Sequence, residues 1–125
     1  MRIPLYLLLV LATVFLNAPV TLAAEGRQAI PAPPGKVTLL DLGSLSCIPC
    51  KMMEPILAKL KKEYQDQAEI VFIDISKERE QARQYDIQVI PTQIFYTRQG
   101  EEIYRHQGFL DEAAARKMLD ILLEE

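Results

Sequence analysis

Histidine, cysteine and tryptophan are almost missing from this sequence. It has one histidine, His106, two cysteines, Cys47 and Cys50, and no tryptophan. A single histidine supports neither a cysteine–histidine catalytic pair nor a zinc site that adds further ligands to the two cysteines. We therefore expect no metal site and no cofactor.

An excess of charge of one sign is missing too. The 14 lysines and arginines are scattered among 17 aspartates and glutamates, which gives a formal net charge of -3. Nucleic-acid binding needs a basic patch or stripe, so we expect no nucleic-acid partner. The sequence also lacks an internal repeat. Its 125 residues, 50% of them apolar, are typical of one small domain with a core.

A long uninterrupted apolar run is missing as well. The longest apolar run of the chain is short and lies within residues 1–24. Arg2 is the only charge there, the apolar run Leu5–Leu16 follows, and small residues lead to Ala24. This order is typical of a signal peptide that is cleaved after Ala23 or Ala24. The alternative is an uncleaved anchor, because residues 3–24 are just long enough to span a bilayer. The short run favours removal, and we expect a periplasmic or otherwise exported protein.

Residues 25–35 are rich in proline and end in glycine, which predicts a tether, and one folded domain is expected over residues 36–125. Buried strands, helices with a three-to-four-residue apolar period and a hairpin alternate in this domain. The predicted elements are a strand at 36–43, a helix at 49–64, a buried strand at 69–75, a short helix at 77–85, strands at 92–97 and 101–107, and a closing helix after residue 111. Ser76 and Asp111 are the expected N-caps of the last two helices. The order predicts an α/β fold in which helices cover a mixed four-stranded sheet.

Both cysteines stand where the first predicted helix begins, in "SCIPCK". Free backbone N–H groups and the helix dipole stabilise a thiolate at such a position, so we expect Cys47 to be nucleophilic. Cys50 lies one turn further in, where it should be less accessible but close enough to resolve a mixed disulfide. A purely structural disulfide is the weaker interpretation, because so short a loop constrains the unfolded chain little.

These motifs together resemble the thioredoxin family. They are Asp41 six residues before Cys47, the "CIPCK" motif itself, Pro55 five residues after Cys50, and "VIPT" ahead of a hairpin. The resemblance runs from about Val37 to the C-terminus. It implies a thioredoxin-like fold with the minimal β-α-β-α-β-β-α core, and the activity of a thiol–disulfide oxidoreductase with a redox-active Cys47–Cys50 disulfide.

The resemblance also implies roles for single residues. Cys47 would be the nucleophile and Cys50 the resolving thiol. The residues implied in substrate binding are Ile48, Pro49, Ile90, Pro91 and Gly108. The Ile90–Pro91 peptide bond is expected to be cis and to present the backbone of Ile90 to an extended substrate segment. The alternative is an ordinary trans proline at the start of an edge strand.

Asp41 is a candidate catalytic residue because it interrupts the apolar run "LLDL". The flanking leucines predict burial, and burial raises the pKa of a carboxyl group. Such a group could accept the proton of Cys50 when that thiol attacks the mixed disulfide. The alternative is an acid that is solvated at the end of its strand. The spacing shared with the family favours the catalytic interpretation.

The chain departs from the family at several places. Ser46 stands before Cys47 where thioredoxins commonly carry tryptophan, Ile48 replaces the usual glycine, and the tether is too short for the family's extra N-terminal strand and helix. We expect a monomeric reductant of disulfide-containing protein substrates, with apocytochrome c as a candidate and a membrane protein as electron donor. The alternatives are an oxidase or isomerase in the same compartment, or a redox-inert binding module.

Overall fold

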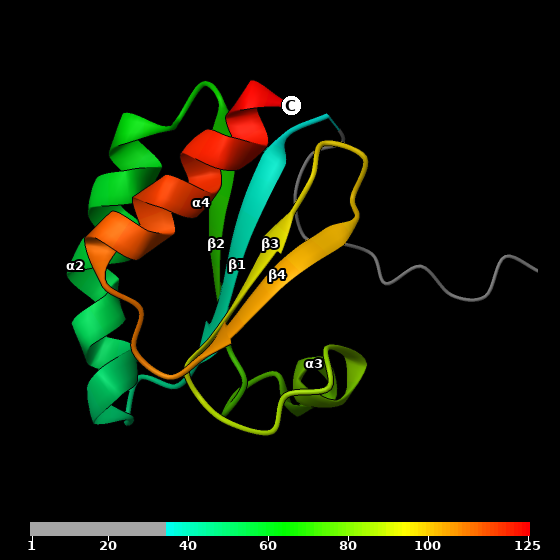
Figure 1. The fold of residues 1–125 in the computed structure, drawn as a ribbon. Coiled ribbons are helices and arrows are strands. Elements are labelled where there is room, and N and C mark those ends of the chain that lie inside the picture. The colour runs from blue at the N-terminus through cyan, green and yellow to red at the C-terminus, as the bar shows by residue number, and fades with distance from the viewer. Residues whose placement is uncertain (1–34) are drawn as a thin grey trace, which may run out of the picture.

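The computed structural model describes residues 35–125, so the predicted signal and all but the last residue of the predicted tether lie outside the described residues. Within this range the chain forms three helices and four strands in the predicted order (Figure 1). They are β1 (Val37–Gly43), α2 (Ile48–Glu63), β2 (Ala68–Asp74), α3 (Arg79–Gln84), β3 (Thr92–Tyr96), β4 (Glu102–Gln107) and α4 (Glu112–Glu124). None of the helices in this range is long and apolar enough to cross a bilayer.

The four strands form one mixed sheet in the order β2-β1-β3-β4. β1 pairs in parallel with β2 and antiparallel with β3, while β3 and β4 form an antiparallel hairpin. The predicted mixed four-stranded sheet is therefore confirmed. β1 lies in the middle of it and is buried over its whole length, which explains why its sequence is mostly apolar.

The helices cover the two faces of the sheet unequally, with α2 and α4 on one face and α3 beyond the other (Figure 1). Residues of β1 alternate between the two sides. Leu39 packs in a cluster with residues of α2 and α4, and Leu40 packs in a second cluster with Tyr85. The apolar stripes of the two long helices meet the sheet through Met53, Leu57, Leu60, Ala115, Leu119 and Leu122.

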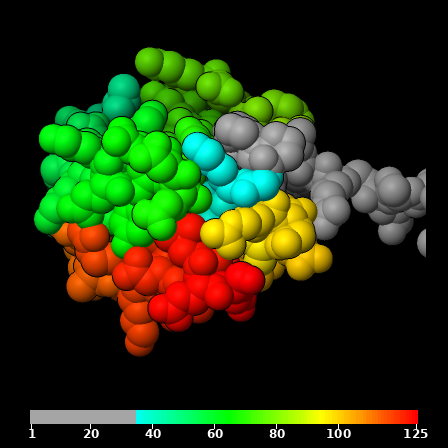
Figure 2. Space-filling view, turned by 90° about the horizontal axis from the view of Figure 1, so that it is seen from above, coloured from blue at the N-terminus to red at the C-terminus, as the bar shows by residue number. Residues whose placement is uncertain are grey.

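The two ends of the sheet differ. At one end the last turns of α2 and α4 and the β3–β4 turn crowd around the start of β1 (Figure 2). At the other end β1 leads directly into the start of α2 (Figure 1). That second end holds both cysteines, so the fold places them where the carboxyl ends of β1 and β2 meet.

One of the two predicted helix caps is confirmed and the other is wrong. Asp111 precedes α4, and its carboxylate accepts a hydrogen bond from the Ala114 N–H at 2.9 Å. Ser76 does not cap α3, which begins three residues later, at Arg79. Its backbone N–H instead donates to Asp74 Oδ1 at 3.0 Å, so a local turn competes with the helix start.

The prediction that the second strand is buried is also wrong for part of β2. Phe72 is 37% exposed, and Glu69 and Val71 are only half-buried. The reason is that β2 lies at the edge of the sheet and has a neighbouring strand on one side only. The apolar side chains of β2 are thus only partly buried.

Leu119 and Ile121 of α4 offer a matched test of this packing. Leu119 is fully buried against the sheet, whereas Ile121 is 42% exposed. We expect Leu119→Ala to lower the free energy of unfolding by about 2–5 kcal/mol, because it leaves a cavity in the core. Ile121→Ala should change it by about 0.5 kcal/mol or less. Urea unfolding of both variants measures the difference, and equal losses would contradict the packing described.

Candidate active site

Cys47 and Cys50 form a disulfide at the first turn of α2, with their Cα atoms 5.2 Å apart. Cys47 is the N-cap residue, and its sulfur accepts a hydrogen bond from the Cys50 N–H at 3.4 Å. The predicted place of Cys47 at the leading edge of the helix is therefore confirmed. Cys47 is half-buried, while Cys50 is only 3% exposed, so Cys47 is the more accessible of the two sulfurs, as the order of attack and resolution would require.

The start of α2 favours negative charge on the sulfur of Cys47. The first turn contains no acidic residue, and Lys51 follows directly after Cys50. In the reduced protein the backbone N–H of Cys50 can donate to a thiolate at Cys47, and the positive end of the helix dipole points at it. These groups stabilise the ionised, nucleophilic form of this thiol rather than of Cys50.

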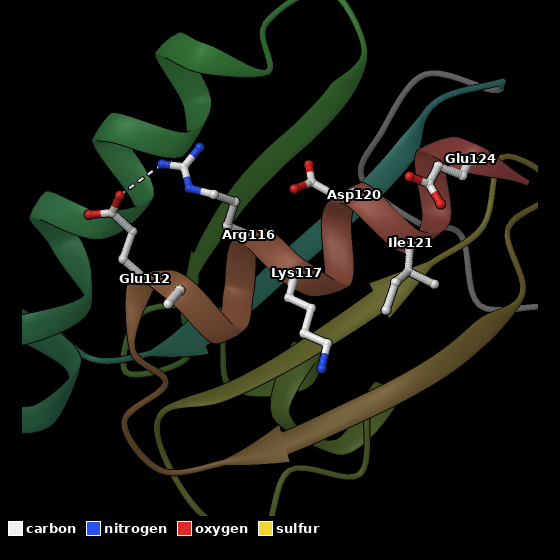
Figure 3. Close-up of a pocket in the computed structure, with 7 residues that line it drawn as sticks. Glu112, Arg116, Lys117, Asp120, Ile121 and Glu124 are labelled. Atoms are coloured by element: carbon white, nitrogen blue, oxygen red, sulfur yellow. Dashed lines mark hydrogen bonds and ion pairs between the residues drawn. The ribbon is translucent and has the colours of Figure 1, made fainter.

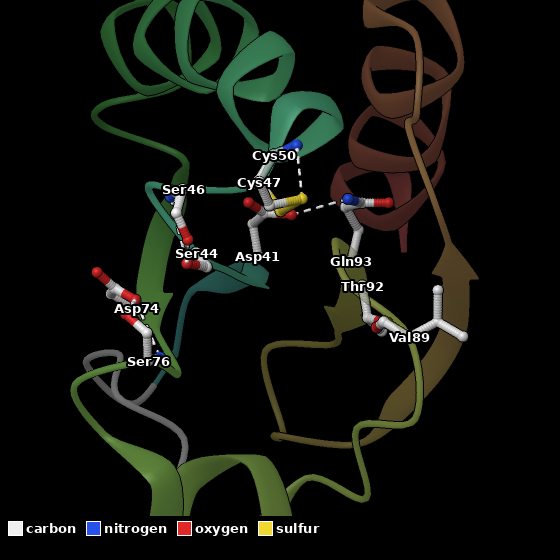
Figure 4. The surroundings of a disulfide bond; sticks show 10 residues. All are labelled: Asp41, Ser44, Ser46, Cys47, Cys50, Asp74, Ser76, Val89, Thr92 and Gln93. Atoms are coloured by element: carbon white, nitrogen blue, oxygen red, sulfur yellow. Dashed lines mark hydrogen bonds between the residues drawn. A yellow bond between two sulfur atoms is a disulfide. The ribbon is translucent and has the colours of Figure 1, made fainter.

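Asp41 lies below the cysteine pair and is completely buried (Figure 4). Burial raises the pKa of this carboxyl from its usual 3.8 to about 6, although a hydrogen bond from Gln93 opposes the rise. Oδ1 accepts that bond at 2.7 Å, and Oδ2 has no hydrogen-bond partner within the protein. The predicted burial is confirmed, and the alternative of a solvated acid at the end of the strand is wrong.

Gln93 is the residue at this site that sequence analysis missed. It stands on β3 directly opposite Asp41 of β1, and it too is completely buried. The signal was present, because Gln93 interrupts the apolar strand "TQIFYT" as Asp41 interrupts "LLDL". A polar side chain at a core position needs a partner, and two such residues in one sheet are candidates to pair with each other.

Gly43 allows the helix and the sheet to approach closely at Cys50. A β-carbon at Gly43 would lie 3.1 Å from the Cys50 sulfur and 3.3 Å from the ring of Phe72. Both distances are shorter than ordinary contact, so any side chain here would displace the resolving cysteine. The small residue thus sets the position of Cys50 above the end of β1.

The residues predicted to bind substrate gather at the same end of the sheet. The Ile90–Pro91 bond is cis, and the next residue, Thr92, pairs with Leu42 near the end of β1. Gly108 donates its backbone N–H to the Pro91 carbonyl at 2.7 Å, which fixes the two segments side by side. Ile48 is 76% exposed beside the disulfide. Pro91 itself is buried, so only neighbouring groups are open to a ligand.

Other features of the described chain carry less chemistry. Among residues 35–125 no three histidine, cysteine or acidic side chains are grouped so that they could hold a metal ion. His106 is half-buried, with Nε2 3.1 Å from the Phe109 carbonyl. A hollow runs along the outer side of α4 (Figure 3), but its Arg116 is already paired with Glu112 and Glu63. None of the predicted site residues lines that hollow.

Comparison with known proteins gives consistent results. The thioredoxin family model matches residues 23–120 of the chain. A thioredoxin-like protein of Synechocystis is 33% identical over 88 residues, which are 70% of this chain and 83% of that protein. The thioredoxin of Bacillus subtilis is 33% identical over 84 residues, which are 67% of this chain and 80% of that protein. The crystal structure of Deadhead, a germline-specific thioredoxin of Drosophila melanogaster, matches with a TM-score of 0.63 and 31% identity, covering 70% of this chain and 82% of that one.

The raised pKa of Asp41 predicts a specific pH dependence of stability. Because the folded protein binds this proton more tightly than the unfolded chain does, the contribution is fully present below pH 3.8 and is lost as the pH rises through about 6. The loss amounts to about 3 kcal/mol. Asp41→Asn cannot ionise and therefore does not lose this contribution as the pH rises. Its gain, the unfolding free energy of the variant minus that of the unchanged protein, should be larger at pH 7 than at pH 4 by about this amount.

Urea unfolding of the oxidised protein at both pH values measures this gain. Asp66→Asn, which removes an exposed carboxyl group, is the matched control. A gain for Asp41→Asn that is the same at pH 4 and pH 7 would contradict the raised pKa.

Proposed function

The chain belongs to the thioredoxin family and is a thiol–disulfide oxidoreductase, and from this premise we propose that it reduces disulfides of exported protein substrates through Cys47 and Cys50. The observation that carries the proposal is the unequal environment of the two sulfurs. Cys47 is only half-buried at the N-cap of α2, and Cys50 is buried one turn behind it.

The exchange proceeds in two steps. The Cys47 thiolate attacks one sulfur of the substrate disulfide, forms a mixed disulfide and releases the other substrate sulfur as a thiolate, which takes up a proton. Cys50 then attacks the Cys47 sulfur, which frees the second substrate thiol and closes the Cys47–Cys50 disulfide. Two electrons pass to the substrate. Asp41 accepts the proton of Cys50, for which its pKa of about 6 is suited.

The surface around Cys47 suits an extended apolar segment of the substrate. Exposed apolar side chains come from the loop before α2, from α2 itself and from the segments on either side of the β3–β4 hairpin. They are Leu45, Ile48, Met52, Val89 and Phe109, each at least 40% exposed. With Ser46 before the nucleophile, this rim is aliphatic more than aromatic. We expect apolar side chains beside the substrate cysteine to favour binding.

The compartment in which the protein acts and the direction in which it transfers electrons are part of the same proposal. The apolar segment at residues 5–16 supports export, with the domain either released or held at the membrane by that segment. Pro49, the Ile90–Pro91 pair and Asp41 resemble reducing members of the family more than oxidants. A reductant in such a compartment needs electrons from a membrane protein, and apocytochrome c is a candidate substrate. Ile48 in the dipeptide favours the second candidate function, a disulfide oxidase or isomerase.

The direction is tested by a redox titration of the Cys47–Cys50 disulfide against dithiothreitol and glutathione. A reductant should have a potential of about -270 mV, whereas a value of about -120 mV would make the protein an oxidant. Ile48→Gly is the matched variant, since it introduces the glycine that is usual at this position in the family. The difference in potential between the two proteins measures how far Ile48 raises it.

Substrates are identified by expressing the full chain with Cys50→Ser. Without the resolving thiol the reaction stops at the mixed disulfide, so exported disulfide proteins should remain attached to Cys47 and be released by dithiothreitol. The double variant Cys47→Ser with Cys50→Ser is the control and should trap nothing. If the single variant traps no protein, or only cytosolic ones, disulfide reduction in an exported compartment is refuted.

A further inference from the structure

One row of side chains crosses the whole sheet beneath the cysteine pair. The register places Phe72 of β2 opposite Asp41 of β1, Asp41 opposite Gln93 of β3, and Gln93 opposite His106 of β4. Residues paired across strands point to the same face, which here is the face that α2 covers. Three of the four side chains are polar, so this row departs from the apolar pattern of the core around it.

The contact between Asp41 and Gln93 divides the two carboxylate oxygens between different tasks. Gln93 Nε2 donates to Asp41 Oδ1 at 2.7 Å, and both residues are completely buried. Asp41 Oδ2 has no partner within the protein, and neither has Gln93 Oε1. The oxygen without a partner is therefore the one that remains open to receive a proton, and Figure 4 shows the carboxyl group between the cysteines and Gln93.

We propose that Gln93 is a positioning residue for the resolution step: its amide holds Oδ1 of Asp41, so that Oδ2 takes the proton that Cys50 releases. The proposal rests on the proposed function, in which Asp41 accepts that proton. No bond other than the Cys50 S–H and the new Oδ2–H changes in this transfer. Gln93 itself neither gains nor loses a proton.

The surroundings of the pair leave few other groups that could control Asp41. On α2 the titratable groups that face it are the thiols of Cys47 and Cys50 in the reduced protein. The neighbour on β2, Phe72, is apolar, and α4 packs on this face through Ala115, Leu119 and Leu122. His106 stands on β4 beyond Gln93 in the same row. The amide of Gln93 thus contacts the Asp41 carboxylate directly. Its hydrogen bond favours the ionised form and lowers the pKa of Asp41, whereas burial raises that pKa.

The decisive experiment uses the oxidised full chain, in which the linked cysteines do not titrate. The carboxyl carbon of Asp41 is followed by NMR as the pH changes, in the unchanged protein and in Gln93→Met, which keeps the length of the side chain without its donor. The midpoint, about 6 in the unchanged protein, should rise by about one pH unit or more in Gln93→Met. Thr92→Val, a buried polar neighbour on the opposite face, should leave it in place.

A second readout links this shift to the reaction. In single-turnover reduction of a disulfide peptide, the pH profile of the resolution step should move by the same amount in Gln93→Met, and Gln93→Met should add nothing in an Asp41→Asn background. An unchanged carboxyl midpoint overturns the proposal. Equal loss of rate at every pH, without a shift of the profile, would make Gln93 merely structural and overturns it too.

Two further controls keep the outcomes separate. If Gln93→Met does not fold, the side-chain N–H signals of Gln93 in the unchanged protein must follow the Asp41 midpoint, and signals that ignore it refute the contact. His106→Gln tests the remaining titratable neighbour, and a shift as large as that of Gln93→Met would refute the assignment to Gln93. If Asp41→Asn keeps the pH profile of the unchanged protein, Asp41 is not the proton acceptor and that step of the proposed function fails. This outcome does not depend on the midpoint measured for the Asp41 carboxyl group in the unchanged protein.

Discussion

The close packing of the start of α2 on the end of β1 is the contact on which the site depends. Gly43 ends β1 under Cys50, and its missing side chain lets the buried sulfur lie directly above the sheet. The same helix start leaves Cys47 partly accessible at the N-cap, where backbone N–H groups favour a thiolate. Two cysteines that are neighbours in sequence thereby acquire different access to solvent and different charge stabilisation.

The buried Asp41–Gln93 pair opposes the stability of this packing. A core of leucine and isoleucine would accept apolar residues at both positions, and the oxygens without partners cost free energy in their present place. Burial, however, is what brings the pKa of Asp41 to about 6, close to neutral pH. A carboxyl group with that pKa below a cysteine pair can move a proton, which gives a chemical reason for keeping a destabilising group in the core.

Most of the fold could be predicted because its local signals agree with its tertiary environment. The apolar run of β1 lies in the centre of the sheet, and Asp111 caps α4 as its residue type indicates. The failures have identifiable causes. Ser76 is bound by the carboxylate of Asp74, a competing local partner, and Phe72 is partly exposed because β2 lies at the sheet edge. The edge position of β2 follows from how the other strands pair, and the apolar residues of β2 do not reveal it.

The amino-acid sequence by itself determined the class of reaction, because the spacing of Cys47 and Cys50 at a helix start and an acid within an apolar strand are local features. Tertiary structure alone decided which side chain lies beside that acid. Gln93 is 52 residues from Asp41 along the chain, and only the antiparallel register of β1 and β3 places the two opposite each other. A slip of one residue would turn Gln93 to the other face of the sheet, so no local pattern could specify their hydrogen bond.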